Sequence, residues 1–244
     1  MYLTETNVLE TTKILYKYKL NAYLNALSAL MFVQILALFF SFLGVGSMGF
    51  GSSTVNLQVT TYSGSMVIVF SLMWAFIISI TMTTKPYRNS DFSFVTNRVT
   101  SHLSSIAFLI TACIFAGVTS MLMGLLLKVI MYFRFGGEII GSHVGVTDLF
   151  IGISGTVFYL ILLSSLGYFV GVLSQLHKMM KFILPIVFFG LLFVWGPNAK
   201  LPSEIVSFFI HESSLFLFIL KVVGTSLLFY MVSILISNRL EVRQ

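Results

Sequence analysis

The chain has 244 residues, of which 57% are hydrophobic and only 9% are charged, and its mean hydropathy is +0.99. A soluble domain is about one quarter charged, so this composition argues against a soluble globular protein. The 14 basic and 8 acidic residues are spread thinly between apolar runs, which argues against nucleic-acid binding and indicates membrane orientation instead. The single cysteine, Cys113, excludes a disulfide framework, and we expect an inert core thiol.

Residues 7–21 predict an amphipathic helix, because apolar side chains recur at helical spacing. These side chains lie near one face: Val8, Leu15, Tyr18 and Ala22. Lys13 and Lys17 lie one helical step apart on another face. We therefore expect residues 1–23 to form a cytoplasmic helix in the plane of the membrane interface, with these lysines toward lipid phosphates or a cytosolic partner.

Six apolar runs predict an all-α polytopic membrane protein with a transmembrane domain over 24–237 and a short cytoplasmic tail over 238–244. The spans are expected at about 24–43, 65–83, 103–131, 148–173, 182–195 and 215–237, with Asp148 as the N-cap of the fourth. Between the first two spans, a Gly- and Ser-rich stretch without charge is expected to be a loop. The stretch after 196 is too apolar for a solvated loop, which predicts a re-entrant segment between helices 5 and 6 on the outside.

The distribution of basic residues sets the orientation of the six predicted spans. Ten lysines and arginines fall on the side that holds both termini, the 84–102 segment and the 174–181 segment, and four fall on the other side. Basic residues favour the cytoplasmic side. We therefore expect a multi-pass protein of a bacterial plasma membrane with both termini in the cytoplasm.

The polar stretch over 85–102 stands out between the second and third spans. It contains the charged residues Arg88, Asp91 and Arg98 together with the aromatic residues Phe92 and Phe94. One interpretation is a solvated loop that only orients the protein. The other is a short cytoplasmic helix that docks on a soluble ATPase, because exposed phenylalanines are poor residues for a solvated loop.

These features together resemble the membrane subunit of an ABC-2 type (type V) ABC exporter. The resemblance covers nearly the whole chain: an interfacial N-terminal helix, six spans, a cytosolic coupling helix between spans 2 and 3, and a short span 5 followed by re-entrant helices. The proline that this family tends to carry shortly before the arginine is absent, because Val95-Thr96-Asn97 stands there.

The resemblance implies a permease subunit that exports an amphipathic peptide or lipid-like substrate along a pathway lined by spans 1, 2 and 5. Its partners would be a second identical or homologous permease and two cytosolic ATPase subunits, which carry ATP and magnesium. No Walker A motif is present, so no cofactor and no enzyme activity are expected in this chain. The residues implied in docking are Lys13, Lys17, Arg88, Asp91, Phe92, Phe94 and Arg98.

Other function classes stay open. A stand-alone channel or ion-coupled carrier would predict an intramembrane acid and internal repeats, and neither is visible. A rhomboid-like intramembrane serine protease would use Ser154 of a Gly-x-Ser-Gly motif with His211, but the sequence around both residues departs from that family. A structural or immunity-type membrane protein is the remaining class.

Lys221 is an ionisable residue inside the sixth predicted span. Such a residue is a functional candidate by default, here for the substrate pathway. The alternatives are an ion pair with Glu204 or Glu212, or a side chain that reaches the outer headgroups. The four histidines fall in different segments without ligand spacing, so no metal site is expected.

Overall fold

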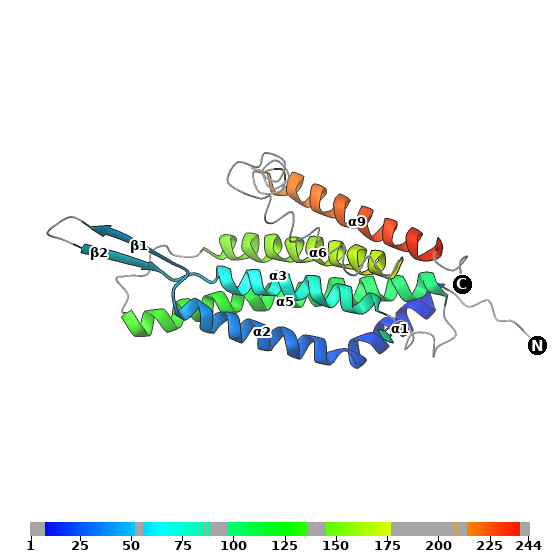
Figure 1. The fold of residues 1–244 in the computed structure, drawn as a ribbon, viewed down its shortest axis with the longest axis horizontal. Helices are drawn as coiled ribbons and strands as arrows, with labels where there is room; N and C mark the ends of the chain where they lie inside the picture. Colours follow the sequence, from blue (N-terminus) through cyan, green and yellow to red (C-terminus); the bar gives the residue numbers. More distant parts are fainter. Residues whose placement is uncertain are drawn as a thin grey trace, which may run out of the picture.

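The computed structural model describes residues 8–51, 56–84, 86–87, 97–135, 145–176, 208 and 214–239. These residues form six helices and one two-stranded sheet (Figure 1). The elements are α1 (Val8–Ala22), α2 (Leu24–Phe42), β1 (Gly46–Gly51), β2 (Asn56–Thr61), α3 (Ser65–Thr83), α5 (Arg98–Phe135), α6 (Val146–Leu176) and α9 (Leu215–Arg239).

Five of these helices, α2, α3, α5, α6 and α9, are long and apolar enough to cross a membrane. They confirm the first four predicted spans and the sixth as helices. The predicted fifth span and the re-entrant segment lie outside the described residues. With 38 residues, α5 is about 57 Å long at about 1.5 Å per residue, well beyond the roughly 30 Å of hydrocarbon. Hence α5 projects from the bilayer or tilts strongly within it.

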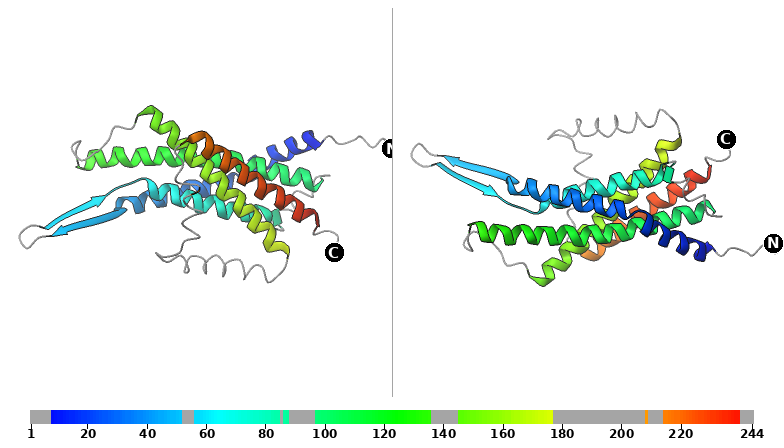
Figure 2. Two further views of the ribbon diagram at one scale, coloured as in Figure 1. Left: turned by 90° about the horizontal axis from the view of Figure 1, so that it is seen from above. Right: turned by 90° about the horizontal axis from the view of Figure 1, so that it is seen from below.

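The long helices run side by side, and their ends sort into two groups (Figures 1 and 2). One end of the bundle collects α1, the end of α3, the start of α5 and the ends of α6 and α9. The opposite end collects the sheet, the end of α5 and the start of α6. The six-span prediction requires α6 to end and α9 to begin on opposite sides, and they do so in both figures.

The stretch between α2 and α3 is a β-hairpin, not the loop that the sequence reading expected. Strands β1 and β2 pair antiparallel, from Gly46 opposite Thr61 to Gly51 opposite Asn56. The signal for β2 was present: in Leu57-Gln58-Val59-Thr60, apolar and polar residues alternate with the period of a strand. β1, the partner of β2, carries little strand signal, because it is rich in glycine and glycine is depleted in strands.

A close contact joins α3 to α6 through two glycines one turn apart. A Cβ added at Gly167 would lie 2.6 Å from the backbone oxygen of Phe76, and one at Gly171 would lie 3.0 Å from the Cα atom of Ile80. Small residues spaced in this way let helix backbones approach closely inside a membrane. The bundle core therefore centres on α3, α5 and α6, where Trp74, Phe108 and Leu160 are buried.

Two local predictions from sequence were wrong in detail. The predicted N-cap residue Asp148 is the third residue of α6, and its carboxylate accepts a hydrogen bond from the backbone N–H of Gly145, 3.1 Å away. An acid at this position stabilises a helix start by reaching back to the cap residue. In α1, only Leu15 of the predicted apolar face is buried, whereas Val8 and Tyr18 are exposed. The reason is that α1 packs on α5 through the face that also carries Lys19.

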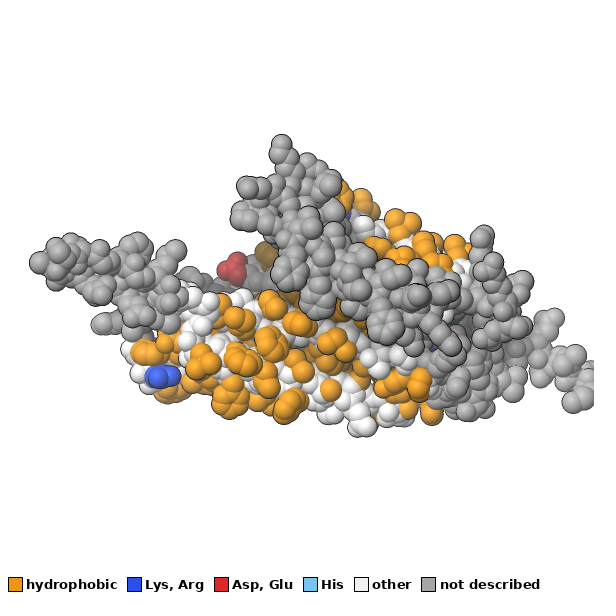
Figure 3. Space-filling model, in the orientation of Figure 1, with side chains coloured by type: hydrophobic (Ala, Val, Ile, Leu, Met, Phe, Trp, Pro, Cys, Tyr) orange, Lys and Arg blue, Asp and Glu red, His pale blue; other side chains and the backbone are white. Residues whose placement is uncertain are grey.

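The lipid-facing surface is apolar, as the composition requires. Hydrophobic side chains cover much of the described surface seen in Figure 3. On α2, the exposed side chains include Phe32, Leu36 and Phe39. A face of this kind is stable in hydrocarbon and not in water.

Candidate functional site

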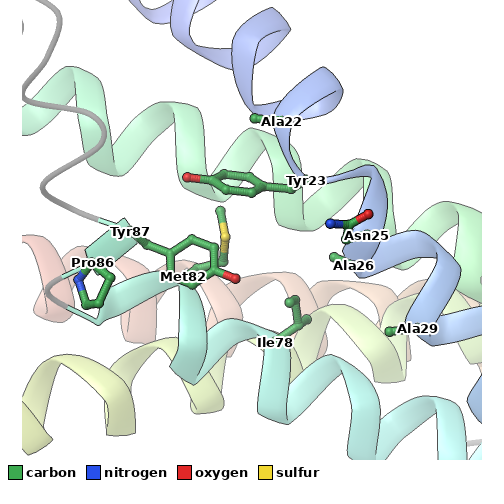
Figure 4. Close-up of a pocket in the computed structure, with 9 residues that line it drawn as sticks. All are labelled: Ala22, Tyr23, Asn25, Ala26, Ala29, Ile78, Met82, Pro86 and Tyr87. Atoms are coloured by element: carbon green, nitrogen blue, oxygen red, sulfur yellow. The ribbon is translucent and has the colours of Figure 1, made fainter.

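A cleft of about 490 Å³ opens between α2 and α3 at the end of the bundle where α1 lies (Figure 4). Its volume falls within the range of about 300–1,000 Å³ that is typical of small-molecule sites. The lining residues are Ala22, Tyr23, Asn25, Ala26, Ala29, Ile78, Met82, Pro86 and Tyr87.

The cleft exists because α2 presents alanines where large side chains would fill the space. Ala26 and Ala29 of α2 lie three residues apart and therefore on one face of that helix, and Ala22, the last residue of α1, adds a third small side chain to the lining. The ring of Tyr23, between α1 and α2, packs against the ring of Tyr87, which follows α3, at a centroid distance of 5.0 Å. The cleft is therefore apolar with a few polar groups at its rim, which suits an amphipathic molecule.

Beside the cleft, α1 is fastened to α5 by a buried cation. Lys19 is only 1% exposed, and its Nζ atom donates hydrogen bonds to the Ser105 hydroxyl at 2.7 Å and to the Ser101 carbonyl at 3.2 Å. In the sequence, Lys19 is only one of the ten basic residues that predict the membrane orientation of the spans. Its position four residues after Leu15, on one helix face, was the clue that it belongs to a packed surface.

A second buried polar cluster joins three helices one residue further along α5. The His102 ring lies 2.6 Å from the Tyr168 hydroxyl through Nδ1 and 2.8 Å from the Ser237 hydroxyl through Nε2. Because a hydroxyl can donate or accept, a neutral imidazole can satisfy both contacts at once. His102 thereby ties α5 to α6 and α9, a role that the sequence did not reveal.

A third cluster lies deeper among the spans. The Ser164 hydroxyl of α6 lies 2.8 Å from that of Ser79 in α3 and 3.3 Å from that of Tyr230 in α9. Cys113 of α5 is buried next to Ser164, as expected for a core thiol. Four helices therefore each contribute one polar side chain to the same place.

Gln34 is the polar side chain at the middle of α2. It is fully buried, and its Nε2 atom donates to the Ser71 hydroxyl at 3.0 Å and to the Ala116 carbonyl at 3.3 Å. Its Oε1 atom has no hydrogen-bond partner. An unpaired buried acceptor lowers stability by about 1–3 kcal/mol. The Gln34 Oε1 atom is therefore an acceptor inside the bundle that is not used for stability.

The structure places only part of the predicted docking set. Lys13 and Lys17 are exposed on α1, as predicted. Arg98 is the first residue of α5. The other four, Arg88, Asp91, Phe92 and Phe94, lie outside the described residues.

The remaining candidates lie toward the opposite end of the bundle. Lys221 donates from Nζ to the Phe208 carbonyl at 3.3 Å and stands 4.0 Å from the centroid of the Phe208 ring. The Ser154 hydroxyl donates to the carbonyls of Phe150 and Ile151 in its own helix. His211, its proposed partner, lies outside the described residues, as do Glu204 and Glu212. In the part of the chain that the structure describes, no group of three metal-ligating side chains is found.

Comparison with protein-family models, with curated proteins and with solved structures finds no match to this chain. By helix length and hydropathy, the chain is a multi-pass helical membrane protein. Its five candidate spans imply contact with a lipid bilayer.

Proposed function

We propose that the chain is the membrane-spanning permease subunit of a bacterial ATP-driven exporter of the ABC-2 type. In this proposal both termini are cytoplasmic, a second permease subunit completes the pathway, and two soluble ATPase subunits bind at the end that carries α1. ATP hydrolysis belongs to those partners. The cargo is an amphipathic peptide or a lipid-like molecule.

One observation carries the proposal. α1 packs against the first turns of α5, so the N-terminal helix lies beside the start of the helix that follows the predicted docking residues in the chain (Figure 1). A soluble motor bound at this end would contact two adjacent elements that are fixed to each other. Force on either element would then reach α5, the longest helix of the bundle.

The cleft supports the cargo class. It lies between α2 and α3, the first two spans, which are two of the three spans expected to line the pathway. It also opens at the end that the proposal assigns to the cytoplasm. Its alanine wall and tyrosine rim fit a molecule with an apolar body and a polar end.

The test is co-purification in a mild detergent followed by an ATPase assay. We expect a subunit with a Walker A motif to accompany the tagged chain. The combined changes Phe92→Ala, Phe94→Ala and Arg98→Glu should remove it, because they delete the aromatic contacts and reverse the charge of the proposed docking surface.

The other end of α5 offers a matched control. Phe133, Arg134 and Phe135 are exposed there, so Phe133→Ala, Arg134→Glu and Phe135→Ala make the same chemical change away from the docking end. This control should retain the ATPase. If no ATPase accompanies the unaltered chain in several detergents, the exporter proposal is wrong.

The His102 cluster favours a second candidate, an ion-coupled carrier. Ionisable groups buried in membrane spans often form proton relays, and His102 bridges hydroxyls of α6 and α9. The chain alone, reconstituted in vesicles that contain a pH-sensitive dye, would then conduct protons without ATP. His102→Gln would abolish that flux. The exporter proposal expects no flux in either vesicle preparation.

A further inference from the structure

The contact between α1 and α5 has a lysine at its centre. Leu15, Lys19 and Tyr23 follow each other at intervals of four residues and therefore lie along one face. Leu15 and Lys19 are each 1% exposed, and Tyr23 packs edge-on against Phe108 with ring centroids 5.7 Å apart. An apolar side chain would fit the middle of this contact between α1 and α5, which we call the seam. The presence of a lysine there therefore requires an explanation.

The Lys19 ammonium, the Ser105 hydroxyl and the Ser101 carbonyl are hydrogen-bonded to one another. The Lys19 ammonium donates to the Ser105 hydroxyl and to the Ser101 carbonyl. The Ser105 hydroxyl donates in turn to the same Ser101 carbonyl, at 2.9 Å. If the ammonium were removed, the serine hydroxyl and the carbonyl would still bond to each other. The fold therefore does not need Lys19 to satisfy these two groups.

A buried cation contributes little to stability by itself, because its desolvation offsets its hydrogen bonds. What a single buried polar side chain does provide in a helix seam is a unique register. A slide of α1 by one turn toward the C-terminal end of α5, about 5.4 Å, would carry the ammonium from Ser105 toward the buried side chains of Phe108 and Leu109. An apolar residue at position 19 would tolerate that slide far better.

We propose that Lys19 is a positioning residue that sets the axial register of α1 on α5. α1 and the first two turns of α5 then behave as one unit. This register is independent of transport, whereas its use to pass force from an ATPase to the bundle rests on the proposed function. The nearby Ser104 hydroxyl donates to the same Ser101 carbonyl, at 2.9 Å, and provides a control serine in the same turn of α5.

The test uses the full chain with Cys113→Ala and spin labels at the exposed positions 17 and 103. Pulsed electron paramagnetic resonance should give a single narrow distance distribution when Lys19 is present. Lys19→Met should broaden or split it, while the thermal unfolding midpoint stays the same or rises. Lys19→Arg, which keeps a buried donor, should restore the narrow distribution. Lys13→Met, a change of the same kind at an exposed lysine, should have no effect.

Ser105→Ala and Ser104→Ala form a second pair that tests the same contact without touching the lysine. Only Ser105→Ala should broaden the distribution. A narrow distribution in Lys19→Met, or equal effects of the two serine changes, would overturn the proposal. A Lys19→Met chain with an unchanged distance and a lower midpoint would make Lys19 a stabilising residue only. None of these readouts depends on a partner, so an absent ATPase would refute the proposed function and leave the register intact.

Discussion

Three polar side chains illustrate how this bundle uses hydrogen bonds in hydrocarbon. Lys19 and His102 place donors and acceptors against serine and tyrosine hydroxyls of neighbouring helices, whereas Gln34 satisfies only its amide nitrogen. Hydrogen bonds between membrane helices average only about 0.6 kcal/mol, so none of these contacts holds the bundle together alone. Their effect is to select one arrangement of helices among several with similar apolar packing.

Gln34→Met should leave stability unchanged or raise it by up to about 1 kcal/mol. The change removes an unpaired acceptor that costs about 1–3 kcal/mol and gives up two modest hydrogen bonds. Ser71 keeps its own bond to the Val67 carbonyl, at 2.8 Å, so no new group is left unpaired. Thermal unfolding in detergent measures the change. A loss of more than about 2 kcal/mol would show that the Gln34 amide is required for packing.

At the scale of elements, close approach between helices depends on where the glycines lie. In α6, Gly167 and Gly171 face α3, while an added Cβ at Gly155 would have nothing within 4 Å. The same residue type therefore allows close packing on α3 at Gly167 and Gly171, whereas Gly155 has free space beside it. The cleft shows the reverse case, in which small side chains leave a space open between α2 and α3.

Gly167→Ala should destabilise the bundle by about 1–3 kcal/mol, because the added methyl meets the rigid backbone oxygen of Phe76. Gly155→Ala is the matched control in the same helix. It should be neutral or stabilising by up to about 1 kcal/mol, the helix-propensity gain of alanine. Thermal unfolding of the two variants side by side gives the comparison, and equal midpoints would contradict the predicted packing of α6 on α3.

Ala29→Phe should close the cleft. A cysteine at Ile78, on the opposite wall, reports the closure through its reaction rate with an apolar maleimide. We expect the rate to fall roughly tenfold, which corresponds to about 1.4 kcal/mol. Ser28→Phe adds the same ring at an exposed position that does not line the cleft, and it should leave the rate unchanged. Equal rates in both variants would mean that the cleft is not open to apolar molecules.

At the scale of the molecule, the two ends of the bundle differ in kind. One end gathers α1, the start of α5 and the cleft, and the other end carries the β-hairpin (Figure 1). The hairpin contains no charged residue, and neither does the connection to α3. The basic residues of α1 predict that its end of the bundle faces the cytoplasm.

Labelling with a membrane-impermeant maleimide tests this assignment. In cells that produce the chain with Cys113→Ala, a cysteine at Thr61, the exposed last residue of β2, should react without permeabilisation. A cysteine at Lys17 should react only after the membrane is opened. The reverse pattern would invert the predicted orientation, and with it the side on which an ATPase could bind.

The positions of the helices follow closely from the sequence. The predicted second span coincides with α3 (Ser65–Thr83), and the first differs from α2 by one residue at its end. This agreement has a simple cause, because a membrane-crossing helix must bury all its backbone polar groups within one apolar run. β1 escaped prediction because hairpin pairing is a contact between two segments, and each segment alone carries only a weak pattern.

The sequence by itself therefore determined that this is a multi-pass helical membrane protein, and the approximate positions of its five candidate spans. Only the tertiary structure decided which polar residues meet. Lys19 and Ser105 are 86 residues apart, and His102 and Ser237 are 135 apart. Local hydropathy shows that burying each such residue is unfavourable, but it does not show which residue becomes its partner. The partner depends on how the helices pack. The cleft also depends on tertiary packing. Ala26 and Ala29 are common helix residues in the sequence of α2, and they leave a space only because α3 lies beside them.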